Sequence, residues 1–264
     1  MFHTIKQGTL EYLTADALEG SVHCFSTRLG GVSEGQLSSL NLGTHRGDKP
    51  ENVRENYRIL GKAVGFAPEE TVFTRQEHTD LLLRVGRADC GTGLDREQTA
   101  VCDGILTDEP GVALVCFAAD CTPVLLFDPV RQAIAAVHAG WRGTAQGIAY
   151  KAVLRMQEEF GCASEDIRAC IGRCCFEVGP EVPDAMREAL GADAEAAIEP
   201  RGEKAHVDLK LLNRIWLQKA GVQVIDVSPD CTMCHPDRFW SHRVTGGARG
   251  SQAAIIRLKG GAAQ

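Results

Sequence analysis

The sequence predicts an α+β fold in which mixed β-sheets lie between outer helices. Strand-like apolar runs follow one another as in hairpins in some places and are separated by amphipathic helical segments in others. The 264 residues are 44% hydrophobic, which is enough to bury a substantial core. No Pro-, Ser- or Gly-rich linker divides the chain. We therefore expect a single domain over residues 1–264 and not a doubly wound parallel sheet.

Three helices are predicted from apolar stripes and capping residues. The first covers 50–65 and has Asp48 as its cap and Pro50 in its first turn. The second covers 144–160 and closes at Gly161, and the third begins after Asp208. Their core faces share helical spacing and consist of Val53, Tyr57, Leu60 and Val64, then Ile148, Ala152, Met156 and Phe160, then Leu212, Trp216 and Ala220.

Strands are predicted at 22–27, 71–76, 81–85, 111–119, 123–127, 132–137, 222–227 and 253–258. The runs 111–119, 123–127 and 132–137 are apolar throughout, as is typical of strands buried on both faces. Asp120-Cys121-Thr122 lies between the first two of them, and His138 stands at the carboxyl end of the third. Burial of a carboxylate beside a thiol is unfavourable unless both have partners.

The spacing leaves two interpretations of Cys121 and His138. They form a metal or nucleophile site at the strand ends, where α/β enzymes usually keep their chemistry. Alternatively, Cys121 is a small core residue and His138 a half-buried structural one. The sequence alone does not choose between them.

Charge and cysteine content limit the function classes. The formal net charge of −7 argues against a nucleic-acid surface, although local arginines could hold a phosphate. The first residues lack the pattern of a signal peptide, and no run reaches the roughly 18 to 20 apolar residues of a membrane span. We expect a cytoplasmic protein that binds neither nucleic acid nor membranes, and its eleven cysteines are then expected to be reduced thiols.

Several motifs match familiar sites only in part. Cys231-Thr-Met-Cys234-His235 has the spacing of a c-type haem attachment site, but that chemistry requires export, and a second CxxC for structural zinc is missing. No His is followed two positions later by Glu, which excludes the zinc base deaminases. No H-x-H pair supports a multicentre copper enzyme. The Gly-rich segments near Arg28 and Arg249 favour turns or an anion site formed by backbone N–H groups.

Seven motifs follow one another in order: Phe25-Ser-Thr-Arg28-x-Gly-Gly-Val-Ser33, Ser39-Leu-Asn41-Leu-Gly43, Gly47-Asp48 with Val53-x-Glu-Asn56, Gln76-x-His78, Asp103-Gly-x-x-Thr107, Ala119-Asp-Cys121-x-Pro123 and Val137-His-Ala-Gly-Trp-Arg-Gly143. Together they resemble the YfiH-type laccase-domain family, also called multicopper polyphenol oxidoreductase-like, purine nucleoside phosphorylase or peptidoglycan-editing factor. The resemblance continues through Ile171-Gly, Cys175-Phe-Glu-Val-Gly179, His206-Val-Asp-Leu209, Cys231-Thr232 and Ser241-x-Arg243 and covers about residues 20–258. Arg173 and His242 depart from the family pattern, which has Pro and Tyr there.

The resemblance implies the third member of the site and a function. In this family the corresponding His, Cys and His bind one zinc, which maps onto His78, Cys121 and His138, and this set accepts copper as well. Three protein ligands with an open fourth position are typical of catalytic zinc. The implied fold is the YfiH-like cysteine hydrolase fold. The implied activity is phosphorolysis of adenosine, inosine, guanosine and 5′-methylthioadenosine, with adenosine deamination at the same site.

Substrate contacts are predicted from the chemistry of phosphorolysis, which needs cations for phosphate and polar groups for the nucleoside. Arg28, Arg142 and Arg243 are the candidates for phosphate because a guanidinium matches its oxygens. Asn41, Gln76 and Asp103 are candidates for the ribose or the purine edge, and Asp120 is a candidate to orient a metal ligand. The partners expected are thus a purine nucleoside and phosphate, bound by a monomer or a small homo-oligomer.

Two other functions stay open. One is an amidase that removes a misincorporated L-serine from the cell-wall precursor built on UDP-N-acetylmuramate, with Cys121 as nucleophile or ligand. The other is a non-catalytic nucleoside- or metal-binding protein, against which the intact His78, Cys121 and His138 argue.

Overall fold

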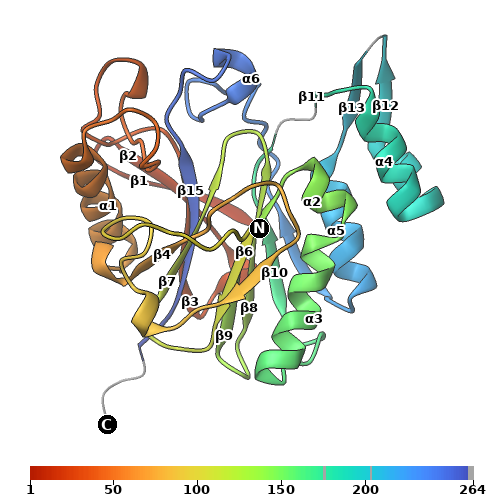
Figure 1. The fold of residues 1–264 in the computed structure, drawn as a ribbon, viewed down its shortest axis with the longest axis horizontal. Coiled ribbons are helices and arrows are strands. Elements are labelled where there is room, and N and C mark those ends of the chain that lie inside the picture. The colour runs from red at the N-terminus through yellow and green to blue at the C-terminus, as the bar shows by residue number, and fades with distance from the viewer. Residues whose placement is uncertain (175–176, 203, 261–264) are drawn as a thin grey trace.

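Figure 1 shows the computed structural model, which describes residues 1–174, 177–202 and 204–260. Cys175 and Phe176 of the family motif and the chain end at 261–264 lie outside the described residues. The helices are α1 (Pro50–Val64), α2 (Trp141–Ala145), α3 (Ile148–Phe160), α4 (Glu181–Leu190), α5 (Leu209–Lys219) and α6 (His242–Thr245). The strands are β1 (Phe2–Gln7), β2 (Leu10–Ala15), β3 (Ser21–Ser26), β4 (Thr71–Phe73), β5 (Leu82–Arg84), β6 (Gly104–Thr107), β7 (Ala113–Ala118), β8 (Thr122–Asp128), β9 (Ala133–Ala139), β10 (Arg168–Ile171), β11 (Glu177–Val178), β12 (Ile198–Arg201), β13 (Lys204–Val207), β14 (Val224–Val227) and β15 (Gln252–Leu258).

The strands form two six-stranded mixed sheets and one small sheet. The first sheet has the order β1-β2-β3-β15-β7-β4, and the second has the order β14-β10-β8-β9-β6-β5. The pairs β4/β7, β5/β6 and β10/β14 are parallel, whereas the other pairs in these two sheets are antiparallel. The small sheet has the order β11-β13-β12. The predicted α+β fold with mixed sheets is confirmed.

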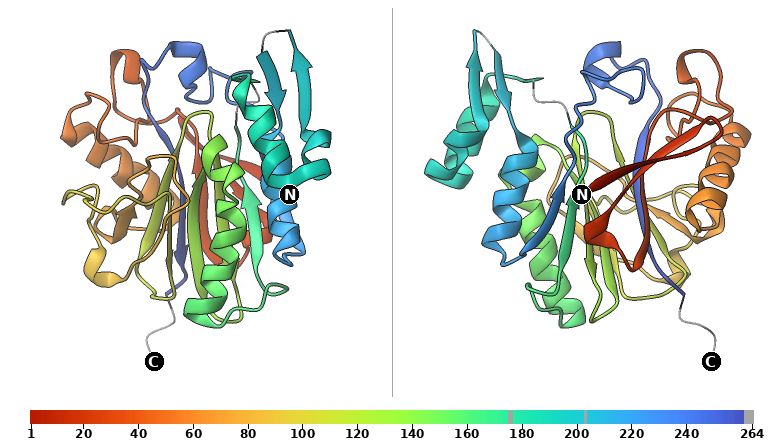
Figure 2. Two further views of the ribbon diagram at one scale, coloured as in Figure 1. Left: turned by 45° about the vertical axis from the view of Figure 1, so that its right-hand side comes forward. Right: turned by 180° about the vertical axis from the view of Figure 1, so that it is seen from behind.

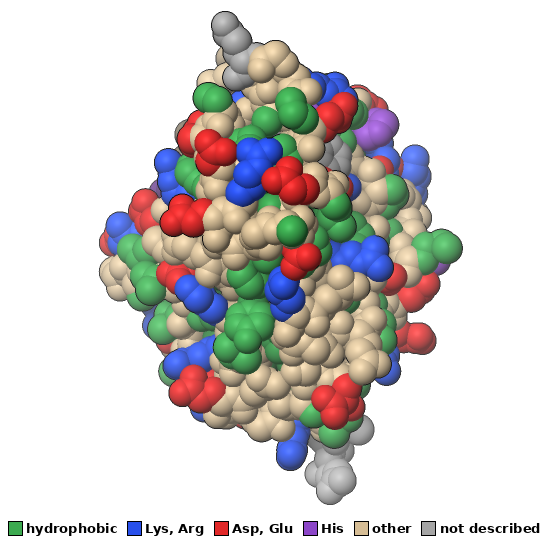
Figure 3. Space-filling view, turned by 90° about the vertical axis from the view of Figure 1, so that its right-hand side faces the viewer, with side chains coloured by type: hydrophobic (Ala, Val, Ile, Leu, Met, Phe, Trp, Pro, Cys, Tyr) green, Lys and Arg blue, Asp and Glu red, His purple; other side chains and the backbone are tan. Residues whose placement is uncertain are grey.

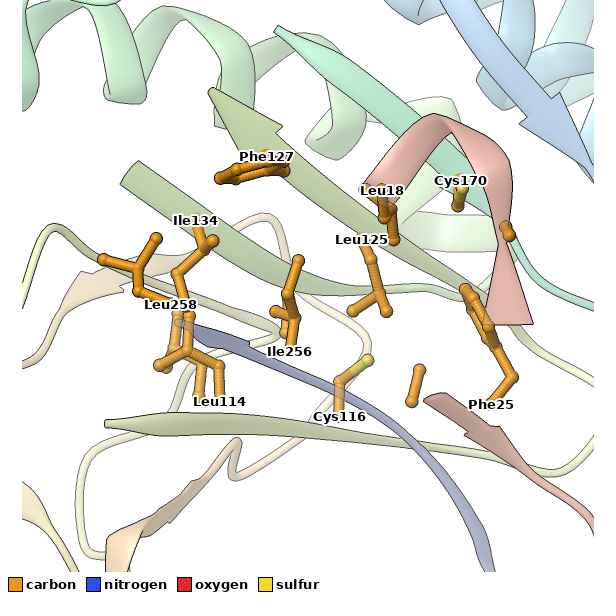
Figure 4. Close-up of a cluster of buried hydrophobic side chains, with 14 of the residues drawn as sticks. Leu18, Phe25, Leu114, Cys116, Leu125, Phe127, Ile134, Cys170, Ile256 and Leu258 are labelled. Atoms are coloured by element: carbon orange, nitrogen blue, oxygen red, sulfur yellow. The ribbon is translucent and has the colours of Figure 1, made fainter. Parts of the chain in front are cut away.

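The two large sheets pack face to face around the main core (Figure 4). Leu114 and Ile256 of the first sheet meet Leu125 and Phe127 of the second there. Along β8 the intervening Val124 and Leu126 point to the opposite face. Because both faces of the strand are covered, its sequence is apolar throughout, as expected for 123–127.

Helices cover the outer faces of both sheets (Figures 1 and 2). Tyr57 and Leu60 of α1 pack against the first sheet in one cluster with Cys24 and Val115. The apolar stripe of α3 packs on the outer face of the second sheet. The helix α4 and the small sheet form a satellite cluster beside α5. The molecule is therefore layered as helix, sheet, sheet, helix.

Two predicted helix ends are confirmed, and the predicted N-cap of α1 is wrong. α1 ends at the left-handed Gly65, and α5 is capped by Asp208, which accepts from Leu211 N at 2.9 Å. Asp48 does not cap α1, because Lys49 is the N-cap residue and Asp48 instead accepts hydrogen bonds from Ser33 and Asn41.

The helix expected over 144–160 is interrupted. α2 begins earlier, at Trp141, and α3 begins only at Ile148, because Gly147 lies between them in the left-handed conformation, with φ 72°. The apolar stripe did not reveal the break, because the stripe begins at Ile148 and does not extend across Gly147. α3 does close at the left-handed Gly161, as predicted.

The predicted strands all exist, with somewhat different ends. Those expected at 71–76, 81–85 and 222–227 are shorter, at β4, β5 and β14. Unpredicted strands are the hairpin of β1 and β2, the strands β6 and β10, and the small sheet. The hairpin was not predicted because its outer strand β1 has only two half-buried residues, Phe2 and Ile5, and shows no alternating apolar pattern.

One face of the molecule carries side chains of both charges. On the face that includes α3, α4 and α5, Lys and Arg side chains alternate with Asp and Glu (Figure 3). Within the described residues, no helix is long and apolar enough to cross a membrane. The described cysteines other than Cys174 are free thiols.

Candidate metal centre

The sheet connections bring three chemically active side chains together. His78 lies in the loop from β4 of the first sheet to β5 of the second, and Cys121 lies in the turn from β7 to β8. His138 is the penultimate residue of β9 and pairs with Pro123 across the antiparallel β8/β9 ladder. This register brings His138 close to the turn that carries Cys121.

The three side chains have the arrangement of a metal centre. One ligand atom from each of His78, Cys121 and His138 can be chosen so that all lie within 4.8 Å of one another. Cys121 Sγ is 3.7 Å from His78 Nε2, and the two imidazole rings are 5.0 Å apart at 84°. His138 is buried, Cys121 is half-buried and His78 is exposed. The set is therefore open to solvent on one side.

Asp103 fixes two members of this set. Its carboxylate is fully buried, accepts from the backbone N–H groups of residues 77, 78 and 79, and lies 2.8 Å from His138 Nδ1. An Nδ1–H that donates to the carboxylate leaves His138 Nε2 as the free nitrogen. Burial acts to raise the pKa of Asp103, but His138 and the Thr79 backbone lower it to about 2. Asp103 is thus the carboxylate that orients the ligands.

Protonation in the metal-free site follows from this geometry. Burial raises the pKa of the Cys121 thiol, but the charge and hydrogen bonds of His138 and His78 lower it to about 6. Burial lowers the pKa of His138, but Cys121 and Asp103 raise it to about 9. Near neutral pH the two side chains form a thiolate–imidazolium pair, and a thiolate is the form of Cys that binds metals.

Gly140 leaves the room that the site needs. A Cβ at this position would lie 2.7 Å from His78 Cδ2 and 3.3 Å from Cys121 Sγ. Its backbone, with φ −68° and ψ 172°, is accessible to any residue. The glycine is therefore required by the close approach of two candidate ligands and not by its own conformation.

A cleft of about 1570 Å³ opens onto the centre. This volume exceeds the usual range of small-ligand pockets, about 300–1000 Å³. The wall combines half-buried Phe117 and Leu94 with polar and charged side chains, among them His45, Arg46, Gln76, Arg243 and Arg249. The cleft therefore offers both an apolar surface and cationic groups within reach of His78, Cys121 and His138.

Only two of the six predicted substrate contacts line this cleft. Arg243 is exposed there, with its guanidinium 3.7 Å from Glu177. Gln76 also lines it, but the Gln76 amide bridges β4 and β7, donating to Phe117 O and accepting from Phe117 N. The side chain of Gln76 thus holds the wall in place.

The other four lie outside the lining of the cleft. Asn41 is fully buried and binds the backbone of Gly43 and Ser251, so it organises the loops beside the cleft. Asp103 has the role described above. Arg28 donates to two backbone carbonyls and stacks on Trp240 at 3.9 Å. Arg142 is exposed and stacks on Trp141 at 4.2 Å.

Asp120 connects the centre to the C-terminal segment. Its carboxylate accepts from the Thr232 hydroxyl at 2.6 Å and from the Arg243 backbone N–H at 2.8 Å. Asp120 itself has φ 88°, and His78 has φ 60°, so two ligand-bearing loops contain a non-glycine residue in the left-handed region. Both oxygens of Asp120 are used to hold the α6 segment over the cleft, rather than to orient a ligand as predicted.

Two cleft arginines were not among the predicted substrate contacts, although the segment near Arg249 was named as a possible anion site. Arg46 and Arg249 line the cleft from segments far apart in the sequence. Burial and the neighbouring charge of Arg46 lower the pKa of Arg249 to about 10, although Asp120 and Cys121 act in the opposite direction. The Gly-rich turn around Arg249 was a signal, but the hydroxyl of Ser251 that Arg249 shares with Arg46 is brought there only by the fold.

The sandwich and the site together define a class: an α+β protein with one candidate metal centre among its described residues. A family model described as multi-copper polyphenol oxidoreductase laccase matches residues 22–259. The chain therefore belongs to the YfiH-type laccase-domain family.

Named relatives agree with this membership. A protein of Bacteroides thetaiotaomicron named purine nucleoside phosphorylase is 37% identical over 247 residues, which span 90% of this chain and 91% of the relative. Purine nucleoside phosphorylase YlmD of Geobacillus stearothermophilus is also 37% identical, over 92% of each chain. The crystal structure of YlmD from that organism matches with a TM-score of 0.90 and 34% identity, covering 97% of this chain and 99% of YlmD.

Proposed function

We propose that the protein is a zinc-dependent purine nucleoside phosphorylase. Its substrates would be adenosine, inosine, guanosine and 5′-methylthioadenosine, and adenosine deamination would be a second reaction at the same site. The observation that carries the proposal is the His78, Cys121 and His138 set, open on one side to a deep cleft. The names of the relatives support the reaction class.

The donor set fits zinc. Two imidazole nitrogens and one thiolate are ligands that zinc prefers, and three of them leave a fourth position for water or substrate. The carboxylate of Asp103 beside His138 Nδ1 is the outer partner that metal-binding histidines usually have. When bound, zinc would supply Lewis acidity and lower the pKa of a coordinated water.

The number of candidate metal centres separates this proposal from a laccase. A multicopper oxidase requires several metal centres that exchange electrons. Among the residues that the structure describes, His78, Cys121 and His138 form the one group of three or more donor side chains close enough to share an ion. A single centre of this kind favours acid–base and Lewis-acid chemistry over four-electron oxidation.

The cleft residues supply the other requirements of phosphorolysis. The half-buried ring of Phe117 offers an apolar face for the purine, next to Leu94 in the same wall. Of the three arginines predicted to contact phosphate, Arg243 lines the cleft. Asp103 accepts the Nδ1–H of His138, so Nε2 is the ring nitrogen left for the ligand set once its own proton is lost. These residues bind and orient the reactants beside the open ligand set.

The test is product analysis of metal-analysed protein incubated with adenosine, with and without phosphate. We expect adenine and ribose 1-phosphate only when phosphate is present, and inosine in its absence. Cys121→Ala should abolish both products, because it removes a ligand. Bound zinc without any nucleoside turnover, together with release of serine from a muramyl-serine nucleotide, would replace the proposal with the amidase.

A further inference from the structure

Arg46 and Arg249 form a pair of cations at the cleft. Arg46 Nε donates to Ser251 Oγ at 3.1 Å, and Arg249 Nη1 donates to the same oxygen at 3.2 Å. One hydroxyl thus holds two guanidinium groups next to each other. Like charges repel at this range, so their juxtaposition is unfavourable unless an anion joins them.

No carboxylate in the described part of the chain neutralises this pair. Neither guanidinium lies within 4.0 Å of an acidic group of the described residues, although the chain has 35 Asp and Glu. Of the other cleft arginines, Arg54, Arg75 and Arg243 each face a carboxylate, and Arg96 donates to two backbone carbonyls. Arg249 Nε is moreover buried without a hydrogen-bond partner. The pair therefore has a hydrogen-bond donor without an acceptor and a positive charge without a carboxylate partner.

The local backbone is adapted to the pair. A Cβ on Gly43 would lie 2.8 Å from Ser251 Oγ and 3.0 Å from Arg46 Cγ. Gly43 thus permits the close approach of the loop that carries Arg46 to the segment that carries Arg249 and Ser251. The two arginines are held by a packed arrangement and are not free surface chains.

The position relates the pair to the metal centre. Both arginines line the same cleft as His78, Cys121 and His138. They also line an adjoining hollow of about 420 Å³, whose lining includes Glu34 but none of the three candidate metal ligands. An oxyanion held by the pair would therefore lie within the cleft but off the metal ligands.

We propose that Arg46 and Arg249 bind a phosphate group of the substrates. Paired guanidinium groups match the oxygens of a phosphate, and their combined charge suits a dianion. Identification of this phosphate as the inorganic cosubstrate rests on the proposed function. The same chemistry would also hold a phosphate carried by a nucleotide. The pair takes the place of Arg28 and Arg142, whose guanidinium groups stack on tryptophans outside the cleft lining.

Calorimetric titration of the zinc-loaded protein with inorganic phosphate tests the proposal. Arg249→Gln and Arg46→Gln should each weaken phosphate binding at least tenfold and raise the KM for phosphate similarly, with zinc content unchanged. Arg46 is exposed, so its variant keeps the test valid if Arg249→Gln fails to fold. Arg58→Gln is the matched control, because Arg58 pairs with Glu55 outside the cleft lining.

A second titration with adenosine 5′-monophosphate distinguishes the two sources of the phosphate. Binding of the nucleotide but not of inorganic phosphate, lost in both variants, would support a phosphate carried on the substrate. Wild-type affinity of both variants for both probes would overturn the proposal. Arginine-dependent phosphate binding without any phosphorolysis would contradict the proposed function and leave the anion site standing.

Discussion

Asp103 connects the loop of one candidate ligand to the ring of another. It binds three successive backbone N–H groups around His78 and the Nδ1 of His138. The sequence predicted Asp103 as a contact to the ribose or the purine edge. Its partnership with His138 depends on the pairing of β6 with β9, which places the two residues next to each other and which no local pattern reveals.

Replacement of Asp103 by Asn tests this role. The side chain keeps its size but loses the charge that fixes the His138 tautomer, so zinc affinity should fall about 10- to 100-fold. A chelator competition titration measures the affinity. Thermal unfolding of the metal-free variant serves as the control for global damage. Unchanged zinc affinity in a folded variant would show that Asp103 is only a structural residue.

The candidate ligands themselves were predictable, and their surroundings were not. Cys121 and His138 stand at the ends of apolar runs, and the family motifs added His78. The role of Gly140 and the pairing of Arg46 with Arg249 around Ser251 were not predictable, because both depend on loops that meet only in the folded chain.

At the scale of elements, a glycine sets a helix boundary that the apolar pattern did not predict. The apolar stripe of 148–160 predicted α3 correctly in register, but the start at 144 was wrong because Gly147 interrupts the helix. The helix before the break, α2, begins directly after Gly140 of the candidate site.

Substitution of Gly147 measures the importance of the break. Gly147→Ala should lower the free energy of unfolding by about 1 kcal/mol, because the left-handed conformation is unfavourable for a residue with Cβ. Gly147→Asn should cost less, since Asn tolerates this conformation. A Cβ would contact the Trp216 ring at 3.5 Å without a clash, so sterics do not complicate the comparison. Urea denaturation with equal losses in both variants would contradict the explanation.

The β2–β3 hairpin contains a pH-sensitive contact. His23 Nε2 accepts from Ala15 N at 2.9 Å, and burial lowers the pKa of His23 to about 4. An unfolded His titrates near 6.5, so the contact stabilises the fold fully above about pH 6.5 and loses this contribution as the pH falls toward 4. The effect amounts to roughly 3 kcal/mol at most.

His23→Gln should remove this pH dependence. The difference in unfolding free energy between wild type and variant is expected to be largest near pH 7 and to shrink steadily toward pH 4, where protonation weakens the wild type. Chemical denaturation at several pH values in the same buffer series measures the difference. A difference that stays constant over this range would show that His23 does not titrate as described.

For the whole molecule, the sandwich explains why the site lies where it does. Two of the three candidate ligands stand on connections that cross from the first large sheet to the second, and the third ends a strand of the second sheet. The site therefore forms only when the two sheets pack. Mixed sheets between outer helices were predictable from the order of strand-like and helical segments. Which strands pack against each other across the core was not, because apolar runs covered on both faces do not identify the partner of each face.

Activity as a function of added zinc tests the central claim most directly. Phosphorolysis of inosine by metal-free protein should rise in proportion to zinc and reach its plateau at one zinc per chain, because one ligand set binds one ion. Full activity without metal, or activity that requires copper or more than one ion per chain, would contradict the account.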